Sequence, residues 1–78
     1  MAIEAFVLIR AETGSAFSVA ATVSALDGVT ASDVVTGPYD VIARIGAATL
    51  DELATLVVSK IQAVHGITRT YTCPVFTR

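Results

Sequence analysis

Polar groups able to bind a small ligand are concentrated in one short segment, Thr36-Gly37-Pro38-Tyr39-Asp40. A zwitterion needs an acceptor for its ammonium and donors for its carboxylate, and this segment offers one carboxylate, hydroxyls and backbone N–H groups. The residue types alone favour a plain tight turn, because Gly-Pro sets the backbone and Asp commonly accepts turn amides. A second hydroxyl-rich segment, Thr70-Tyr71-Thr72, is expected near the turn of a neighbouring subunit.

Residues suited to catalysis are scarce. The single histidine, His65, is expected in the last turn of a helix beside Gly66, where a cation favours the helix dipole. The single cysteine, Cys73, precedes Pro74 and has no base near it in the sequence. The glycines match no phosphate-binding pattern, and Cys73 lacks the companions of a metal site. We therefore expect no enzyme, and assign no catalytic residue, metal or cofactor.

The composition predicts one self-associating domain over residues 1–78. The chain is 54% apolar and 15% charged, which is more apolar than a small monomer needs, so the surplus points to contacts between copies. The longest uncharged run, Thr13 to Leu26, is shorter than the roughly 18–20 residues that span a bilayer. With no basic segment before Glu4 and only one cysteine, neither a secretory signal nor a disulfide is expected, and the predicted compartment is the cytoplasm.

Charge gives no sign of a nucleic-acid partner. The formal net charge is −2, and the five basic residues are scattered along the sequence. A protein that binds nucleic acid needs a basic patch to neutralise phosphates, so we expect no direct binding.

An internal repeat organises the chain, because Leu26-Asp27-Gly28-Val29-Thr30 recurs as Val64-His65-Gly66-Ile67-Thr68. In each half, apolar residues alternate as in a strand and then follow helical spacing. Ser15 is the expected N-cap of the first helix and Thr49 of the second, with Gly28 and Gly66 as left-handed terminators. The expected strands are 3–10, 29–35, 41–45 and 67–71, with a short edge strand at 75–77 beyond Pro74, and the helices are 16–26 and 50–64.

The order β-α-β-β-α-β with right-handed crossovers predicts a ferredoxin-like α+β sandwich. Its four-stranded antiparallel sheet would carry both helices on one face. The other face would expose Phe6, Leu8 and Ile42, which predicts a homodimer formed through the sheet. Arg44 and Arg69 are expected on strands at that interface. The uncharged outer side of the first helix, at Ala21 and Ala25, is a weaker candidate for a further subunit contact.

Three motifs in this order resemble the ligand-binding domain of the Lrp/AsnC (feast/famine) transcriptional regulators: the Gly28-Val29 step, Thr36-Gly37-Pro38-Tyr39-Asp40, and Gly66-Ile67-Thr68-Arg69-Thr70-Tyr71. The resemblance covers nearly the whole chain. It implies a sensing domain that dimerises through its sheets and assembles dimers into rings, often octamers. It also implies a free amino acid as the effector, bound at clefts between dimers.

Carried over residue by residue, the resemblance implies an effector cleft at Thr36, Gly37, Tyr39 and Asp40. It implies effector-response positions at Tyr71, Thr72 and Cys73, with Thr70 in the same segment. The regulators also carry a helix-turn-helix, whereas here the first strand is expected from Ile3, so this chain resembles the stand-alone members. A full-length DNA-binding homologue is then a candidate partner. Pro38 occupies a variable position, and Cys73-Pro74 departs from the apolar continuation of the family.

Three other functions remain open at this stage. An ACT-like amino-acid-binding module has the same topology, so fold alone does not separate it from the first family. A small dimeric α+β-barrel enzyme of the monooxygenase or isomerase kind would need a deep pocket between helices and sheet. The third alternative is a structural partner that joins rings of regulators and binds no effector.

Overall fold

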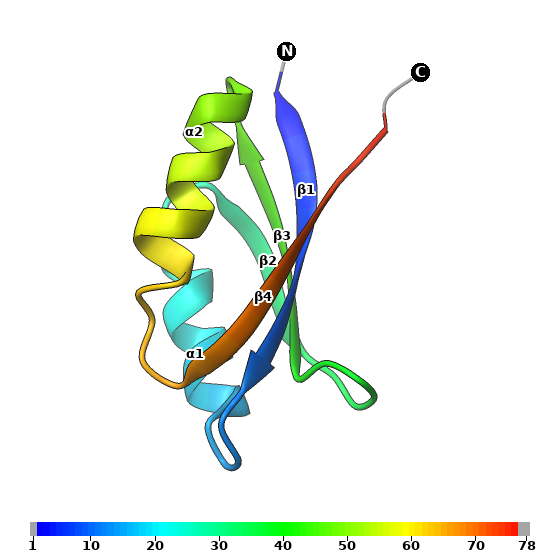
Figure 1. The fold of residues 1–78 in the computed structure, drawn as a ribbon, viewed down its shortest axis with the longest axis vertical. Helices are drawn as coiled ribbons and strands as arrows, with labels where there is room; N and C mark the ends of the chain where they lie inside the picture. The colour runs from blue at the N-terminus through cyan, green and yellow to red at the C-terminus, as the bar shows by residue number, and fades with distance from the viewer. Residues whose placement is uncertain (1, 77–78) are drawn as a thin grey trace.

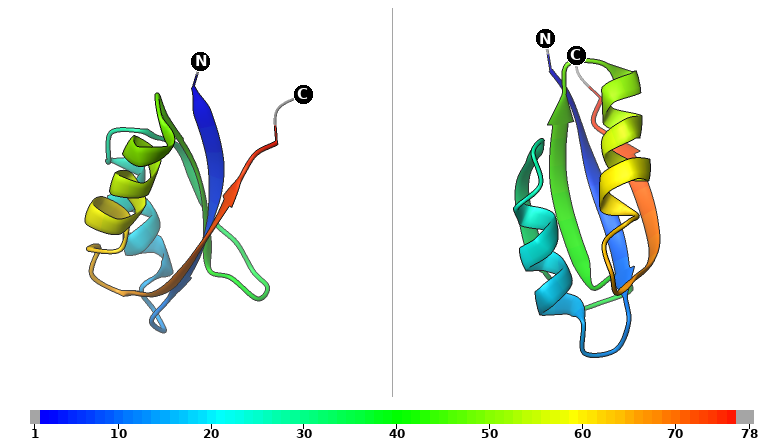
Figure 2. Two further views of the ribbon diagram at one scale, coloured as in Figure 1. Left: turned by 45° about the horizontal axis from the view of Figure 1, so that its top comes forward. Right: turned by 90° about the vertical axis from the view of Figure 1, so that its left-hand side faces the viewer.

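The computed structural model describes residues 2–76. The elements are β1 (Ile3–Ala11), α1 (Ala16–Ser24), β2 (Val29–Val34), β3 (Val41–Ala47), α2 (Leu50–Thr55), the π-helical turn η1 (Leu56–Ile61) and β4 (Ile67–Pro74). The strands form one antiparallel sheet in the order β2-β3-β1-β4. Both helical segments cover the same face of this sheet (Figures 1 and 2). The predicted ferredoxin-like α+β fold is confirmed.

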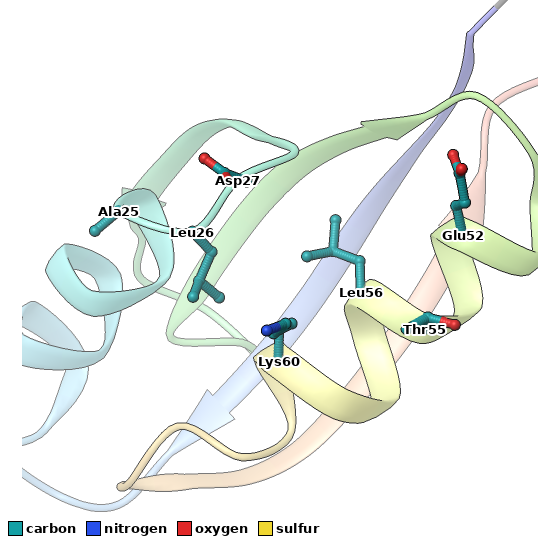
Figure 3. A pocket seen from close by; sticks show the side chains of 7 residues that line it. All are labelled: Ala25, Leu26, Asp27, Glu52, Thr55, Leu56 and Lys60. Carbon is teal, nitrogen blue, oxygen red and sulfur yellow. The ribbon is translucent and has the colours of Figure 1, made fainter.

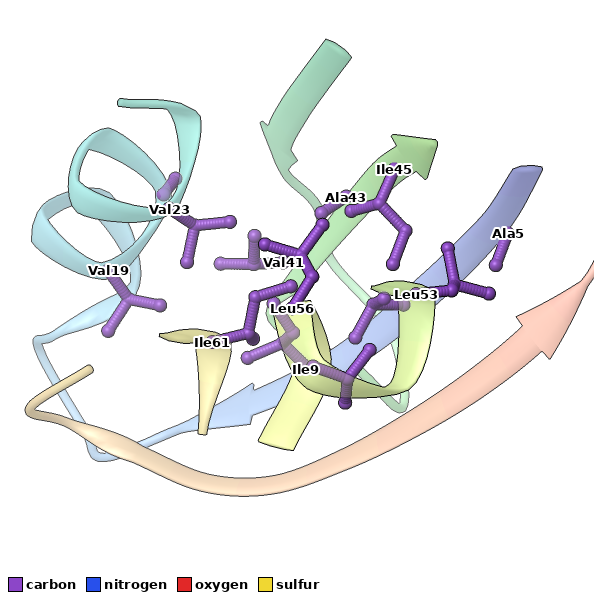
Figure 4. Close-up of a cluster of buried hydrophobic side chains, with 13 residues drawn as sticks. Ala5, Ile9, Val19, Val23, Val41, Ala43, Ile45, Leu53, Leu56 and Ile61 are labelled. Carbon is purple, nitrogen blue, oxygen red and sulfur yellow. The ribbon is translucent and has the colours of Figure 1, made fainter. Parts of the chain in front are cut away.

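The core lies between the helices and the sheet, as Figure 4 shows. Alternate residues of β1 and β3 point into it, because successive side chains of a strand face opposite sides. Complete burial of a side chain such as Ile9 or Ile61 stabilises the fold by about 1.5–3 kcal/mol. The buried residues are Ala5, Val7, Ile9, Val19, Ala20, Val23, Val41, Ala43, Ile45, Leu53, Leu56, Val57 and Ile61.

Both helices end earlier than the sequence predicts. The first ends at Ser24, not Leu26, and the hydroxyl of Ser15 makes no capping hydrogen bond. The second is capped as expected, since Thr49 accepts a hydrogen bond from the Glu52 amide at 3.1 Å. It then widens into the π-helical turn and ends at Ile61, so His65 lies in the following turn and not in the helix. Within residues 2–76 we find no helix long and apolar enough to cross a membrane.

The strands also differ from the predicted bounds. The last strand was expected to be interrupted at Pro74, but it continues to Pro74, which pairs with Ala5 on β1. Proline is tolerated here because β4 is an edge strand and the missing N–H faces away from the sheet. The separate strand predicted at 75–77 is wrong for the first two of these residues, which lie outside any strand, and its third residue lies outside the described part.

Gly28 and Gly66 come directly before β2 and β4, in left-handed conformations with φ of +93° and +97°. A Cβ on Gly28 would approach a methyl of Leu56 to 2.8 Å and the carbonyl oxygen of Gly46 to 3.2 Å. Glycine is therefore required at this position for its conformation and for its lack of a side chain. The predicted left-handed conformation of both glycines is confirmed. Their predicted role as helix terminators is wrong, because the helical segments are capped earlier, at Ala25 and Gln62.

Candidate functional site

The turn that connects β2 and β3 is fixed to the end of β1 by Asp40. The Asp40 amide donates to the Ile9 carbonyl at 2.9 Å, and the Asp40 carboxylate accepts a hydrogen bond from the Ala11 amide at 2.8 Å. Across the base of the turn, the Val35 amide donates to the Asp40 carbonyl at 2.9 Å. Asp40 thus has the structural role that its residue type suggested. Because Oδ2 makes the bond to Ala11, Oδ1 is left to accept from another group.

Tyr39 connects this turn with the last strand. Its ring meets the ring of Tyr71 edge-on, with centroids 5.9 Å apart and planes at 72°. The hydroxyl of Tyr71 in turn accepts a hydrogen bond from Nη1 of Arg69 at 2.9 Å. This bond raises the pKa of the Arg69 guanidinium above its ordinary value. The structure therefore brings Tyr39 of the turn together with Tyr71 of the same chain.

Thr36 and Gly37 lie at the exposed tip of the turn, before Tyr39. The side chains of Thr70 and Thr72 point toward the helices, because alternate residues of a strand face opposite sides of the sheet. Tyr71, between them, faces the side without helices. The hydroxyl of Thr70 accepts a hydrogen bond from Gln62 at 3.0 Å. Within one chain, then, Tyr71 lies by the turn, whereas Thr70 and Thr72 lie on the other face of the sheet.

The face of the sheet without helices, called the open face below, gathers arginines that are far apart in the sequence. Arg10 and Arg69 stand directly opposite each other on β1 and β4. Arg44 on β3 pairs with Glu4 and stacks over the Phe6 ring at 5.0 Å. The basic residues are thus scattered along the sequence, but two of them, Arg10 and Arg69, meet across neighbouring strands. The open face consists of Glu4, Phe6, Leu8, Arg10, Ala31, Asp33, Ile42, Arg44, Arg69, Tyr71 and Cys73.

Sequence reasoning did not place Arg10 near the candidate turn. Arg10 and Arg69 both occupy outward positions of their alternating patterns. Pairing the first strand with the last was therefore the signal that could have brought them together. Their exact opposition depends on the register between β1 and β4, which side-chain alternation alone leaves undetermined.

Two surface hollows lie away from the turn. The one in Figure 3, about 440 Å³, separates the end of α1 from α2 and η1, and Leu26 and Leu56 line it together with the charged residues Asp27, Glu52 and Lys60. The other, about 350 Å³, lies between the second helix and β4, and apolar side chains such as Leu53 and Val57 line it together with Thr72. Neither contains Tyr39 or Asp40.

Several known structures match this chain over nearly its whole length. TTHA0845 from Thermus thermophilus is 33% identical, with 97% of this chain and 95% of that protein covered and a TM-score of 0.91. AsnC from E. coli is 26% identical over 97% of this chain, with a TM-score of 0.89, and 52% of it is covered. The regulator NMB0573 from Neisseria meningitidis, solved as a complex with L-Met, is 18% identical, with a TM-score of 0.84. The match covers 96% of this chain and 50% of that regulator.

This chain thus spans about half the length of each of those two regulators, which it matches in fold. No curated protein matches the sequence. The family model of the Lrp/AsnC ligand binding domain matches residues 4–78, nearly the entire chain. Together with the motifs and the fold, this match shows that the chain belongs to the Lrp/AsnC ligand binding domain family.

Proposed function

We propose that this domain senses a free amino acid in the cytoplasm, binding it at the turn formed by Thr36, Gly37, Tyr39 and Asp40. The observation that carries the proposal is the anchoring of Asp40. Three hydrogen bonds at Asp40 hold the turn against β1 and across its base. A preorganised acceptor loses less entropy on binding than a mobile one.

The chemistry of the turn suits an ammonium group. Oδ1 of Asp40 remains as an acceptor, and the preceding residue, Tyr39, packs its ring edge-on against Tyr71. The related Neisseria regulator was solved with L-methionine, an amino acid with an apolar side chain. That complex supports an amino acid as the class of ligand and makes L-methionine the first probe.

We propose further that the domain works as a homo-oligomer without catalysis. Phe6, Leu8 and Ile42 lie on the open face, where a second copy would cover them. Rings of such dimers, in which a full-length DNA-binding homologue would also take part, require a second contact, because a two-fold contact through the open face closes on itself. Thr70 and Thr72, on the helix side of their own chain, would then contribute to a neighbour's cleft.

A barrel-type enzyme is the less favoured function, because it would need space between the helices and the sheet. That layer is filled by the core side chains, of which Val7, Ile9 and Ile45 are completely buried. The hollows described above open on the surface of the molecule instead.

The test is calorimetry of the wild type with each standard amino acid, followed by the same titration of Asp40→Asn. The amide keeps an oxygen that can accept from Ala11 but removes the charge, so the fold should survive. A hydrogen bond to a charged group contributes about 1.5–3 kcal/mol, so affinity should fall roughly 10- to 150-fold. Unchanged affinity in Asp40→Asn would remove Asp40 from the site. Absence of binding by the wild type would favour the structural-partner alternative.

A further inference from the structure

Among the described residues, Arg10 and Arg69 form a pair of like charges with no acidic partner of their own. They are directly opposed residues of β1 and β4, and in such pairs the Cβ atoms are roughly 4.5–5.5 Å apart. Within residues 2–76 the one ion pair found joins Arg44 to Glu4, so it neutralises neither of the opposed arginines. Like charges in this arrangement destabilise a sheet unless a negative group lies near both.

Each of the two arginines is connected to the proposed turn by its own set of contacts. On the β3 side of Arg10, Asp40 bonds to the carbonyl of Ile9 and the amide of Ala11, the residues that flank Arg10. On the β4 side, Arg69 is held by Tyr71, whose ring meets Tyr39 of the turn. Contacts therefore run from Tyr39, the residue before Asp40, through Tyr71 to Arg69.

The donors needed for a carboxylate are present in this pair. A guanidinium has five N–H donors in a planar fork that matches the two oxygens of a carboxylate. Arg69 uses Nη1 toward Tyr71, which fixes the orientation of the guanidinium while its other nitrogens can still donate. Asp40 is next to Arg10 through the backbone, since its Oδ2 accepts a hydrogen bond from the amide of Ala11. The cluster of two arginines and one aspartate has a net charge of +1, the sum of +2 and −1.

We propose that Arg10 and Arg69 bind the carboxylate of the ligand whose ammonium is held by Asp40. This inference rests on the proposed function and specifies the ligand class: a small molecule with both a free α-ammonium and a free carboxylate. The corresponding amide or amine would lack the negative group that the two arginines require. If backbone amides of the turn alone bound the carboxylate, substitution of either arginine would leave the affinity unchanged.

The experiment follows the side-chain Nε–Hε signals of the arginines by NMR during titration with L-methionine and, separately, with L-methioninamide. We expect L-methionine to shift the signals of Arg10 and Arg69 and leave that of Arg44, while the amide shifts none of them. In calorimetry, Arg10→Gln and Arg69→Gln should each weaken L-methionine binding roughly 10-fold or more. Arg44→Gln is the matched control, because Arg44 lies on the same face but is paired with Glu4.

Two results separate this inference from the proposed function. If L-methionine binds and Arg10→Gln and Arg69→Gln bind it as tightly as the wild type does, the arginine inference is overturned while the amino-acid site stands. If no amino acid binds, sodium acetate replaces L-methionine, with sodium chloride keeping the ionic strength constant. Selective shifts of the Arg10 and Arg69 signals by acetate would then support a carboxylate site without the proposed function. Equal shifts of the signals of all three arginines would overturn the arginine inference.

Discussion

At the scale of single residues, the structure assigns Asp40 to the fold before any ligand is considered. Its carboxylate accepts the Ala11 amide, and its backbone bonds to Ile9 and Val35. Asp40→Ala would therefore lower stability as well as affinity, and loss of binding in that variant would not separate the two roles. Asp40→Asn separates them, because the remaining amide oxygen can still accept from Ala11.

Ser32 is the residue whose side chain is least well satisfied. Its hydroxyl oxygen is buried on β2, opposite Ala43, and has no hydrogen-bond partner among the described residues. A buried polar group without a partner costs about 1–3 kcal/mol, so Ser32→Ala should raise the free energy of unfolding by about 1 kcal/mol. Chemical denaturation measures this change. Ser32→Thr keeps the hydroxyl and should give no such gain; a less stable Ser32→Ala would show that the hydroxyl finds a partner in solution.

At the scale of elements, the sequence predicts the four strands and the two helical segments of the described residues, but not the π-helical turn or the ends of the elements. Over a segment as short as Leu56–Ile61, the spacing of buried residues suits both α-helical and π-helical turns, so the π-helical hydrogen bond from the Gln62 amide to the Val57 carbonyl was not predicted. Pro74 suggested a break, since the sequence did not establish that its strand lies at the edge of the sheet.

The loop after α1 depends on Gly28, which brings that loop against Leu56 and Gly46. Gly28→Ala would combine backbone strain at φ +93° with two short contacts, and should destabilise the protein by about 1–3 kcal/mol or more. Gly14→Ala is the matched control. Gly14 has a similar φ of +84° but nothing within 4 Å of the added Cβ. Equal losses of melting temperature in the two variants would contradict the role given to the close packing at Gly28.

At the scale of the whole molecule, the sequence correctly separated the apolar core from a second, partly apolar sheet face. It overestimated how exposed that face is, because Arg44 covers Phe6 and leaves it 38% exposed. More exposed apolar side chains lie elsewhere, such as Phe17 on α1 at 78%. The candidate site was predicted in part: the turn residues were identified from their types, but the approach of Tyr71, Arg69 and Arg10 depends on strand register.

Self-association through the open face predicts a specific response to charge. Leu8 lies at its centre, between Ile42 and Tyr71, so Leu8→Glu would place an unpaired carboxylate in the contact. Light scattering should show a dimer or larger assembly for the wild type at micromolar concentration and a monomer for Leu8→Glu. Ala63→Glu, in an exposed turn, is the control and should not change the mass. A monomeric wild type would contradict sheet-to-sheet dimerisation.

The central claim, an amino-acid site at the β2–β3 turn, is tested most directly by an NMR titration of backbone amides. With L-methionine as the first probe and the other standard amino acids after it, saturable shifts should appear at Thr36, Gly37, Tyr39 and Asp40, since Pro38 has no amide proton. Saturable shifts confined to the residues around the hollow in Figure 3 would place the site between the helices instead. No saturable shift with any amino acid would contradict the claim altogether.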